Sequence, residues 1–181
     1  FNFEDSHIDG GYFHTEPHMI VIYDQVDFCT DIPNSKLERI DRLIVDIAEN
    51  YDRIYDISFR EFEEIVECLL QDKGFQTRLT PKTRDGGVDI IAIKYEIGKP
   101  VCFYVECKRV GRKKSIGINI VRSLFGVQMA DRINKSLLVT TGRITYDARR
   151  FVDGQKMMMS VIDTDKIHKL IRQSALKRGI I

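Results

Sequence analysis

Apolar and β-branched residues gather in the middle of the chain in the pattern of a β-hairpin. Residues 88–93 form an apolar run that follows Gly86 and Gly87, two residues that break any helix. The sequence Gly-Lys-Pro at 98–100 marks a turn, and a second apolar run covers 101–108. We therefore expect two paired strands over 88–108, with the remaining elements arranged around them.

Helical periodicity flanks this hairpin. Residues 35 and 38, and residues 58 and 61, are Ser and Glu at the spacing of capping boxes, so helices are expected to begin at 35 and at 58. Further helices are expected over 118–132, from 145 onward and from 163 or 164 onward. The apolar stripes at helical spacing are Leu37, Ile40, Ile44, Ile47 and Ala48 in the first helix, Phe59, Phe62, Ile65, Val66, Leu69 and Leu70 in the second, and Val121, Leu124 and Gln128 in the third.

Further strands are expected where short apolar or β-branched runs stand between turn residues, at 19–28, 75–79, 136–141 and 160–162. From residue 58 the order is then helix, three strands, helix, strand, helix, strand and helix. A strand after a helix is what a βαβ crossover needs, so the predicted class is α/β, with a central mixed β-sheet flanked by α-helices. We place this domain at 58–181 and set apart a small acidic N-terminal region at 1–57.

Charge divides the chain at the same place. Residues 1–57 hold 13 Asp and Glu against 4 Lys and Arg, a net −9, whereas the part from residue 58 onward has a net +10. A positive field attracts phosphate backbones and contributes most of the non-specific affinity for nucleic acid. The basic domain is therefore expected to bind DNA. The acidic region is expected either to restrain that binding or to pack its helix on the domain as a structural annex.

Composition indicates a folded protein of a reducing compartment. Hydrophobic residues make up 43% and charged residues 30% of the chain, as in ordinary globular proteins. No apolar run approaches the roughly 18 residues that span a bilayer. The four cysteines, Cys29, Cys68, Cys102 and Cys107, lack Cys-x-x-Cys spacing, which argues against a zinc site or a disulfide framework. These features predict a cytoplasmic protein without a membrane partner.

Two carboxylates and one amino group converge in the predicted hairpin. Successive side chains of a strand point to opposite faces, so Glu106 and Lys108 share one face. Antiparallel pairing brings Asp89, near the start of the first strand, toward Glu106. Charges among apolar neighbours are costly unless they pair or bind a metal, and two carboxylates suit Mg²⁺. The alternative is that Asp89 caps a turn and that Glu106 and Lys108 form a solvated ion pair.

The sequence Asp-Gly-Gly-Val-Asp at 85–89, followed by Glu-Cys-Lys at 106–108, resembles the PD-(D/E)xK nuclease superfamily. Within it, the form of these motifs resembles the Mrr-like type IV restriction endonuclease branch, and the likeness covers roughly the last two thirds of the chain. It implies the restriction endonuclease-like fold and metal-dependent hydrolysis of phosphodiester bonds in DNA, in restriction and antiviral defence. Many members of the branch carry Gln where Glu106 stands, and an acidic residue there strengthens the expected metal site.

The resemblance also implies roles for individual residues. Asp89 and Glu106 would bind one or two Mg²⁺ ions, for which Mn²⁺ can substitute, and the main-chain carbonyl of Cys107 would add an oxygen ligand. Lys108 would orient or deprotonate the attacking water and offset developing negative charge.

A glutamate of the second helix completes this set. The run Phe-Glu-Glu-Ile-Val at 62–66 resembles the first helix of the family, which places Glu63 in the active site, where it would position water or a second ion. The helical wheel agrees, because Glu63 lies closest to the apolar stripe, whereas Glu61, Glu64 and Glu67 are expected farther round toward solvent.

Basic residues near this site are candidates for holding DNA phosphates. They are Lys82 and Arg84 before the hairpin, and Arg109, Arg112, Lys113 and Lys114 in a basic loop after it. Gln128 is the polar member of an apolar helical stripe. Its amide is expected either to act as an accessory group at the site or on DNA, or to be satisfied by a hydrogen bond between helices.

DNA is thus the expected partner. The sequence leaves open a homodimer, and a further domain or protein bound through residues 1–57. Two other functions fit the same residues: a structure-specific nuclease such as a junction resolvase, and a nucleic-acid-binding module that does not cleave. The presence of all four residues Glu63, Asp89, Glu106 and Lys108 argues against the binding module, which has no need of them together.

Overall fold

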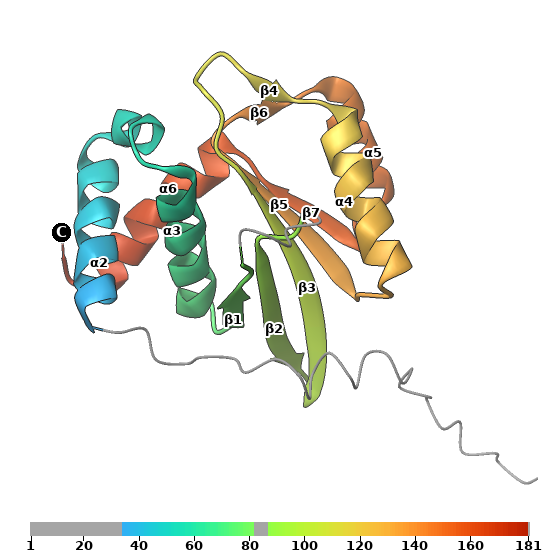
Figure 1. Ribbon diagram of the computed structural model, residues 1–181, viewed down its shortest axis with the longest axis horizontal. Helices are drawn as coiled ribbons and strands as arrows, with labels where there is room; N and C mark the ends of the chain where they lie inside the picture. The colour runs from blue at the N-terminus through green and yellow to red at the C-terminus, as the bar shows by residue number, and fades with distance from the viewer. Residues whose placement is uncertain (1–33, 82–86, 181) are drawn as a thin grey trace, which may run out of the picture.

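A computed structural model describes residues 34–81 and 87–180 of the chain (Figure 1). The strand expected over 19–28 lies outside these residues. Five strands form one mixed sheet in the order β1-β2-β3-β5-β7, with β1, β2 and β3 antiparallel and β3, β5 and β7 parallel. The strands are β1 (Gln76–Leu79), β2 (Ile90–Glu96), β3 (Lys99–Lys108), β5 (Lys135–Thr140) and β7 (Met159–Ile162). The predicted mixed sheet is confirmed.

Helices cover both faces of this sheet (Figure 1). On one face lie α3 (Phe59–Asp72) and α6 (Thr164–Lys177), and α2 (Asn34–Glu49) packs against both of them. On the other face lie α4 (Ile118–Ala130) and α5 (Tyr146–Gly154). All five helices agree with the periodicity of the sequence, so the α/β class is confirmed as well.

Three short elements complete the fold. The 3₁₀ helix η1 (Tyr51–Tyr55) joins α2 to α3, and the strands β4 (Ser115–Ile116) and β6 (Arg143–Ile144) form a small parallel sheet. The sequence pattern does not predict them, because elements of two to five residues have too few positions to show a period.

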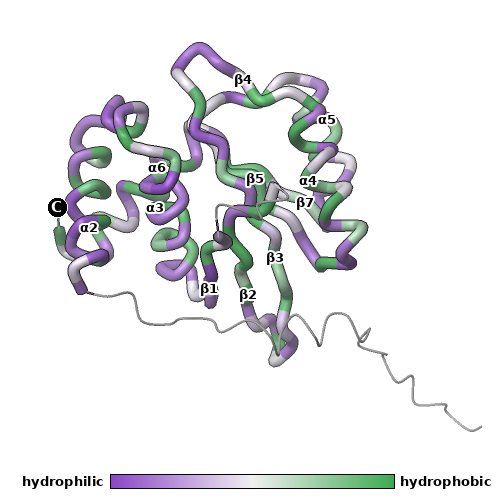
Figure 2. Tube along the Cα trace, viewed as in Figure 1, coloured by the Kyte–Doolittle hydropathy of each residue, from purple (hydrophilic) through white to green (hydrophobic). Residues whose placement is uncertain are grey.

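The two faces of the sheet bury separate apolar cores, as the alternation of strand residues requires. On β3, Val105 and Cys107 belong to the core under α2, α3 and α6, whereas Cys102 and Tyr104 belong to the core under α4 and α5. In Figure 2 the strand β5 is hydrophobic along much of its length, while α2 alternates between hydrophilic and hydrophobic residues. The predicted division of the β3 side chains between two faces is confirmed.

The β2–β3 turn is shorter than the sequence indicates. The loop consists of Ile97 and Gly98 alone, and both have positive φ, 51° and 74°. Two positive φ values in a two-residue loop are typical of a type I′ turn, whose twist matches that of the strands. Lys99 and Pro100 therefore belong to β3 rather than to the turn. Pro100 is tolerated there because β3 pairs with β5 only from Phe103 onward.

α3 begins with the predicted capping box. The Ser58 hydroxyl accepts from the Glu61 amide at 3.2 Å, and the Ser58 amide donates to the Glu61 carboxylate at 2.7 Å. The expectation that Phe59 belongs to the buried stripe is wrong. Phe59 is 61% exposed, because its place in the first turn puts its ring against the guanidinium of Arg109, 4.6 Å from the ring centre, instead of against the core.

The expectation that Glu67 faces solvent is also wrong, since the residue is only 6% exposed. The reason is that α2 and β1 cover this side of α3. The Lys36 amino group on α2 pairs with the Glu67 carboxylate at 3.2 Å, and the Thr77 hydroxyl on β1 lies 3.5 Å from it. A charge buried in this way is accommodated by its partners rather than by water.

α2 is an integral part of one core. Its residues Ile40, Ile44 and Ile47 are buried in the core shared with α3 and α6. This packing matches the alternative in which the helix is a structural annex. The boundary between residues 57 and 58 stays a prediction, as does a restraining role of the acidic region.

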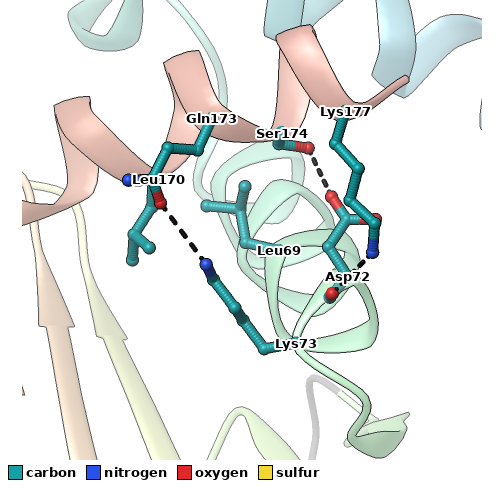
Figure 3. A pocket seen from close by; sticks show the side chains of 7 residues that line it. All are labelled: Leu69, Asp72, Lys73, Leu170, Gln173, Ser174 and Lys177. Atoms are coloured by element: carbon teal, nitrogen blue, oxygen red, sulfur yellow. Dashed lines mark hydrogen bonds between the residues drawn. The ribbon is translucent and has the colours of Figure 1, made fainter. Parts of the chain in front are cut away.

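A polar seam joins α3 to α6 (Figure 3). The Asp72 carboxylate accepts from the Ser174 hydroxyl, and the Asp72 carbonyl accepts from the Lys177 amino group at 2.8 Å. Lys73 donates to the side-chain carbonyl of Gln173 at 3.3 Å. The cavity that these residues line is about 30 Å³, which is room for about one water. The seam is therefore a joint between helices rather than a ligand site.

Three of the cysteines lie among the described residues. Cys68, Cys102 and Cys107 are buried free thiols, and Cys29 lies outside the described ranges. Within those ranges, no helix combines the length and the apolar character that crossing a membrane requires.

Candidate active site

The pairing of β2 with β3 brings Asp89 beside Glu106. The last pair of the ladder is Ile90 with Val105, so Asp89, directly before Ile90, lies next to the end of β3 that carries Glu106. Two hydrogen bonds hold this arrangement: the Asp89 amide donates to the Val105 carbonyl at 2.9 Å, and the Cys107 amide donates to the Asp89 carboxylate at 2.6 Å. The Asp89 carboxylate is thus close to Glu106, as the hairpin pattern predicts.

The Glu106 carboxylate is buried and pairs with Lys108. Glu106 is 5% exposed, and the Lys108 amino group lies 2.9 Å from its Oε1. Burial raises the pKa of Glu106; Lys108 opposes this rise and the Asp89 carboxylate adds to it. Burial would lower the pKa of Lys108, but the hydrogen bond with Glu106 and the charges of both carboxylates outweigh it and raise that pKa. A solvated surface ion pair, the alternative interpretation, does not match a carboxylate buried so deeply.

Cys107 presents its main chain to the same place. Its amide points to Asp89, and in an extended strand the N–H and C=O of one residue point to the same side, so its carbonyl also faces that side. The pKa of its thiol is raised well above the usual value, by burial first and then by the carboxylates of Asp89, Glu63 and Glu106. The thiol stays protonated, so the main-chain oxygen is the group that Cys107 offers to a cation.

Glu63 approaches from α3. Its carboxylate is near enough to the Cys107 thiol to raise the pKa of that thiol, which places Glu63 near the end of β3 that carries Glu106. The Arg60 guanidinium pairs with Glu63 at 2.9 Å and lies 3.4 Å from the Thr80 carbonyl. Arg60, which sequence reasoning missed, thereby ties Glu63 to the chain that leads into the hairpin. The sequence feature that could have indicated this pair is the spacing of three residues between Arg60 and Glu63, which places both on one face of the helix.

The donor set fits a hard divalent cation. Asp89 and Glu106 supply carboxylate oxygens and Cys107 a carbonyl oxygen, which suits Mg²⁺, an ion bound through one or two carboxylates with water and phosphate completing its shell. In residues 34–81 and 87–180, no group of three or more His, Cys, Asp or Glu side chains could hold a metal ion. The site would therefore depend on main-chain oxygen, water and substrate in addition to its two side chains.

The basic loop after β3 contacts η1 and the start of α3. Arg112 pairs with Asp52 and lies over the Tyr55 ring, 5.3 Å from its centre. Arg109 donates to the Tyr55 carbonyl at 2.8 Å and lies over the Phe59 ring. Both arginines thus have internal partners near the end of the acidic region. The sequence predicted that both arginines bind DNA phosphate, because nothing in it indicates that η1 lies beside the loop.

The remaining predicted contacts differ in their surroundings. Lys113 and Lys114 are exposed, and Lys82 and Arg84 lie outside the described residues. Gln128 is fully buried: its amide nitrogen donates to the carbonyls of residues 133 and 134, each at 3.2 Å, and its oxygen accepts from the Ser136 hydroxyl at 2.6 Å. These bonds satisfy the Gln128 amide within the fold, but the expected partner is wrong: they run to the segment after α4 and to β5 rather than to another helix.

A family model described as restriction endonuclease, the Mrr catalytic domain, matches residues 54–171. The chain belongs to this family. The matched range runs from η1 into α6 and includes Glu63, Asp89, Glu106 and Lys108. The Mrr-like PD-(D/E)xK assignment made from the sequence is thereby confirmed. Restriction endonucleases of this family generally use divalent metal ions.

Two solved restriction endonucleases share the fold of this Mrr-type domain. The DNA modification-dependent restriction endonuclease AspBHI matches with a TM-score of 0.54 at 20% identity, over 80% of this chain and 36% of that one. The MspJI restriction endonuclease, in complex with a 27-mer oligonucleotide, matches with a TM-score of 0.50 at 15% identity, over 83% of this chain and 34% of that one. At such identities the likeness confirms the restriction endonuclease-like fold alone.

A relative of unknown role is similar in sequence. The uncharacterized protein y4cE of Sinorhizobium fredii (strain NBRC 101917 / NGR234) is 28% identical over 102 residues, which are 56% of this chain and 26% of the relative. The chain therefore spans about a quarter of this relative and about a third of the two solved endonucleases. In each of these proteins the matched region is one part of a longer chain.

Proposed function

We propose that this chain carries the catalytic domain of a DNA endonuclease that hydrolyses phosphodiester bonds with Mg²⁺, which Mn²⁺ can replace. The observation that carries the proposal is the buried Glu106 carboxylate, which lies 2.9 Å from the Lys108 amino group and next to Cys107, whose amide binds the Asp89 carboxylate. Membership of the restriction endonuclease family supports it. Restriction and antiviral defence in the cytoplasm is the biological role that we propose for this activity.

Each residue of the proposed active site has a role that follows from its position. Asp89 and Glu106 bind the cation, with the main-chain carbonyl of Cys107 as a further ligand. A cation held there would supply Lewis-acid chemistry to the phosphate and to water. Lys108 in its charged form donates hydrogen bonds to the phosphate and offsets the negative charge that develops there. Glu63 orients water on the α3 side of the site.

The basic loop would supply contacts to the DNA backbone. Lys113 and Lys114 are exposed, and Arg112 lies in the same loop, next to the end of the catalytic strand. Contacts to phosphate position a protein on DNA without reading its sequence. The loop is therefore proposed to hold the duplex over the site, and any selection of sequence is left to other residues.

Cleavage of supercoiled plasmid by the purified chain tests the proposal. Nicked or linear plasmid is expected with Mg²⁺ and none with EDTA. Plasmid binding without cleavage in Mg²⁺ or Mn²⁺ would favour the non-cleaving module, and cleavage of four-way junctions in preference to plasmid would favour a resolvase. Comparing methylated with unmethylated plasmid tests whether the dependence on DNA modification stated for AspBHI extends to this chain.

A further inference from the structure

Two threonines at the end of β5 hold the main chain just after the proposed catalytic lysine. The sequence Thr-Thr-Gly occupies 140–142, and Lys108 with Thr140 is the last pair of the β3–β5 ladder. Thr140 and Thr141 are fully buried, so their hydroxyl groups need internal partners. Those partners lie at the end of β3, in the loop that follows it and in the Thr-Thr-Gly sequence itself.

Thr140 fixes the main chain of Lys108. Its hydroxyl donates to the Lys108 carbonyl at 2.7 Å and accepts from the Gly142 amide at 3.0 Å. The Thr141 amide adds a longer bond to the Lys108 carbonyl, at 3.3 Å. The carbonyl of Lys108 thus has two donors, one from the last residue of β5 and one from the residue after it, at the point where the Lys108 side chain leaves the strand toward Glu106.

Thr141 fixes Val110 in a way that few side chains can. Its hydroxyl accepts from the Val110 amide at 2.8 Å and donates to the Val110 carbonyl at 2.7 Å. One hydroxyl therefore satisfies both the amide and the carbonyl of Val110, which lies beyond the end of the β3–β5 ladder and has no strand partner there. Serine can make the same two bonds, whereas valine, which has the shape of threonine, can make neither.

Gly142 lets the far end of the basic loop approach the same point. A Cβ atom at 142 would lie 2.5 Å from the Val110 side chain and 2.8 Å from the Lys114 carbonyl. One residue later the β4–β6 ladder begins, with Ser115 paired to Arg143. The loop at 109–114 is thus fastened at both ends by residues 140–143.

We propose that Thr140 and Thr141 are positioning residues of the endonuclease, which act through the main chain of Lys108 and Val110. They keep the Lys108 amino group aimed at Glu106 and keep the basic loop in one place beside the site. The proposal rests on the proposed function and adds to it two residues that carry no charge. An error of about 1 Å in the placement of a reacting group can cost about 100-fold in rate, which is why such residues matter to catalysis.

Thr141→Val and Thr141→Ser, compared with the wild type, test the proposal. Thr141→Val is expected to speed amide hydrogen exchange across residues 108–114 and to lower the cleavage rate at saturating DNA by about 10- to 100-fold. Thr141→Ser is expected to keep both near the wild-type values. Thr77→Val is the matched control, because Thr77 is a buried threonine of β1 whose hydroxyl bonds only α3 side chains. It should leave loop exchange and the saturated rate unchanged.

Wild-type exchange across 108–114 in Thr141→Val would overturn the proposal. A second result would also overturn it: faster amide hydrogen exchange throughout the main sheet, together with a loss of cleavage rate no larger than the fraction of unfolded protein accounts for. That result would show that Thr141 has a purely structural role. If Thr141→Val does not fold, Gly142→Ala replaces it, because the added methyl group displaces the same loop from the other side. A wild-type chain that cleaves no DNA would refute the proposed endonuclease, whereas the exchange measurement would still decide whether Thr141 orders the loop.

Discussion

Asp52→Asn is expected to strengthen DNA binding by releasing Arg112. The Asp52 carboxylate pairs with the Arg112 guanidinium, which is one of the proposed phosphate contacts. DNA phosphate and Asp52 therefore compete for the same cation. Asp52 belongs to the acidic region, residues 1–57 with a net −9, and tethering makes even a weak competitor effective.

The expected gain is small because the pair is exposed. The side chains of Asp52 and Arg112 are 54% and 58% exposed. Exposed ion pairs contribute about 0.2–1 kcal/mol, which corresponds to DNA binding tighter by about 1.4- to 5-fold. The gain should fade as salt screens both the pair and its competitor.

Fluorescence anisotropy with a labelled duplex in EDTA measures this gain without cleavage, at salt concentrations from about 50 to 200 mM. Asp56→Asn is the matched control. It removes the same charge four residues later, but Asp56 pairs with Arg53, at 3.8 Å, and not with the basic loop. Asp52→Asn should tighten binding more than Asp56→Asn. Equal gains would show that net charge alone matters, and no gain in Asp52→Asn would refute competition for Arg112.

Two other substitutions test the surroundings of the site. Neutralising Arg112, Lys113 and Lys114 together should weaken binding to all sequences alike and lower the log–log salt slope by about 0.9 for each lost contact; an unchanged slope would exclude the loop from the interface. Lys36→Met should lower the free energy of unfolding by about 1–3 kcal/mol, since it leaves the Glu67 carboxylate buried without its cation. Urea unfolding measures the loss. Adding Glu67→Gln should recover part of it, and wild-type stability in Lys36→Met would contradict the account.

The sequence predicted the parts of the fold that follow from a local period. A period of two along 101–108 placed Glu106 and Lys108 on one face, and a short antiparallel connection was enough to bring Asp89 toward Glu106. The capping box at Ser58 located the start of α3 to the residue. These features depend on neighbours in sequence or on a single hairpin, so no knowledge of distant packing is needed to find them.

What the sequence could not predict depends on distant segments. Glu67 is buried because α2 and β1 cover it, and Phe59 is exposed because it ends up against the basic loop. The helical periodicity of α3 carries no information about either contact. The hydrogen bonds of Thr140 and Thr141 were hidden for the same reason, since their partners on β3 and its loop lie about 30 residues earlier in the chain.

Cleavage by Asp89→Asn tests the central claim most directly. The asparagine oxygen can still accept from the Cys107 amide, now 2.6 Å from the Asp89 carboxylate, so the substitution removes a charge and leaves the hairpin intact. Asp72→Asn is the matched control, because Asp72 is a largely buried carboxylate that pairs with Arg178 in the seam between α3 and α6. The account predicts that folded Asp89→Asn binds plasmid but does not cleave it with Mg²⁺, while Asp72→Asn cleaves as the wild type does. Wild-type cleavage by folded Asp89→Asn would contradict it.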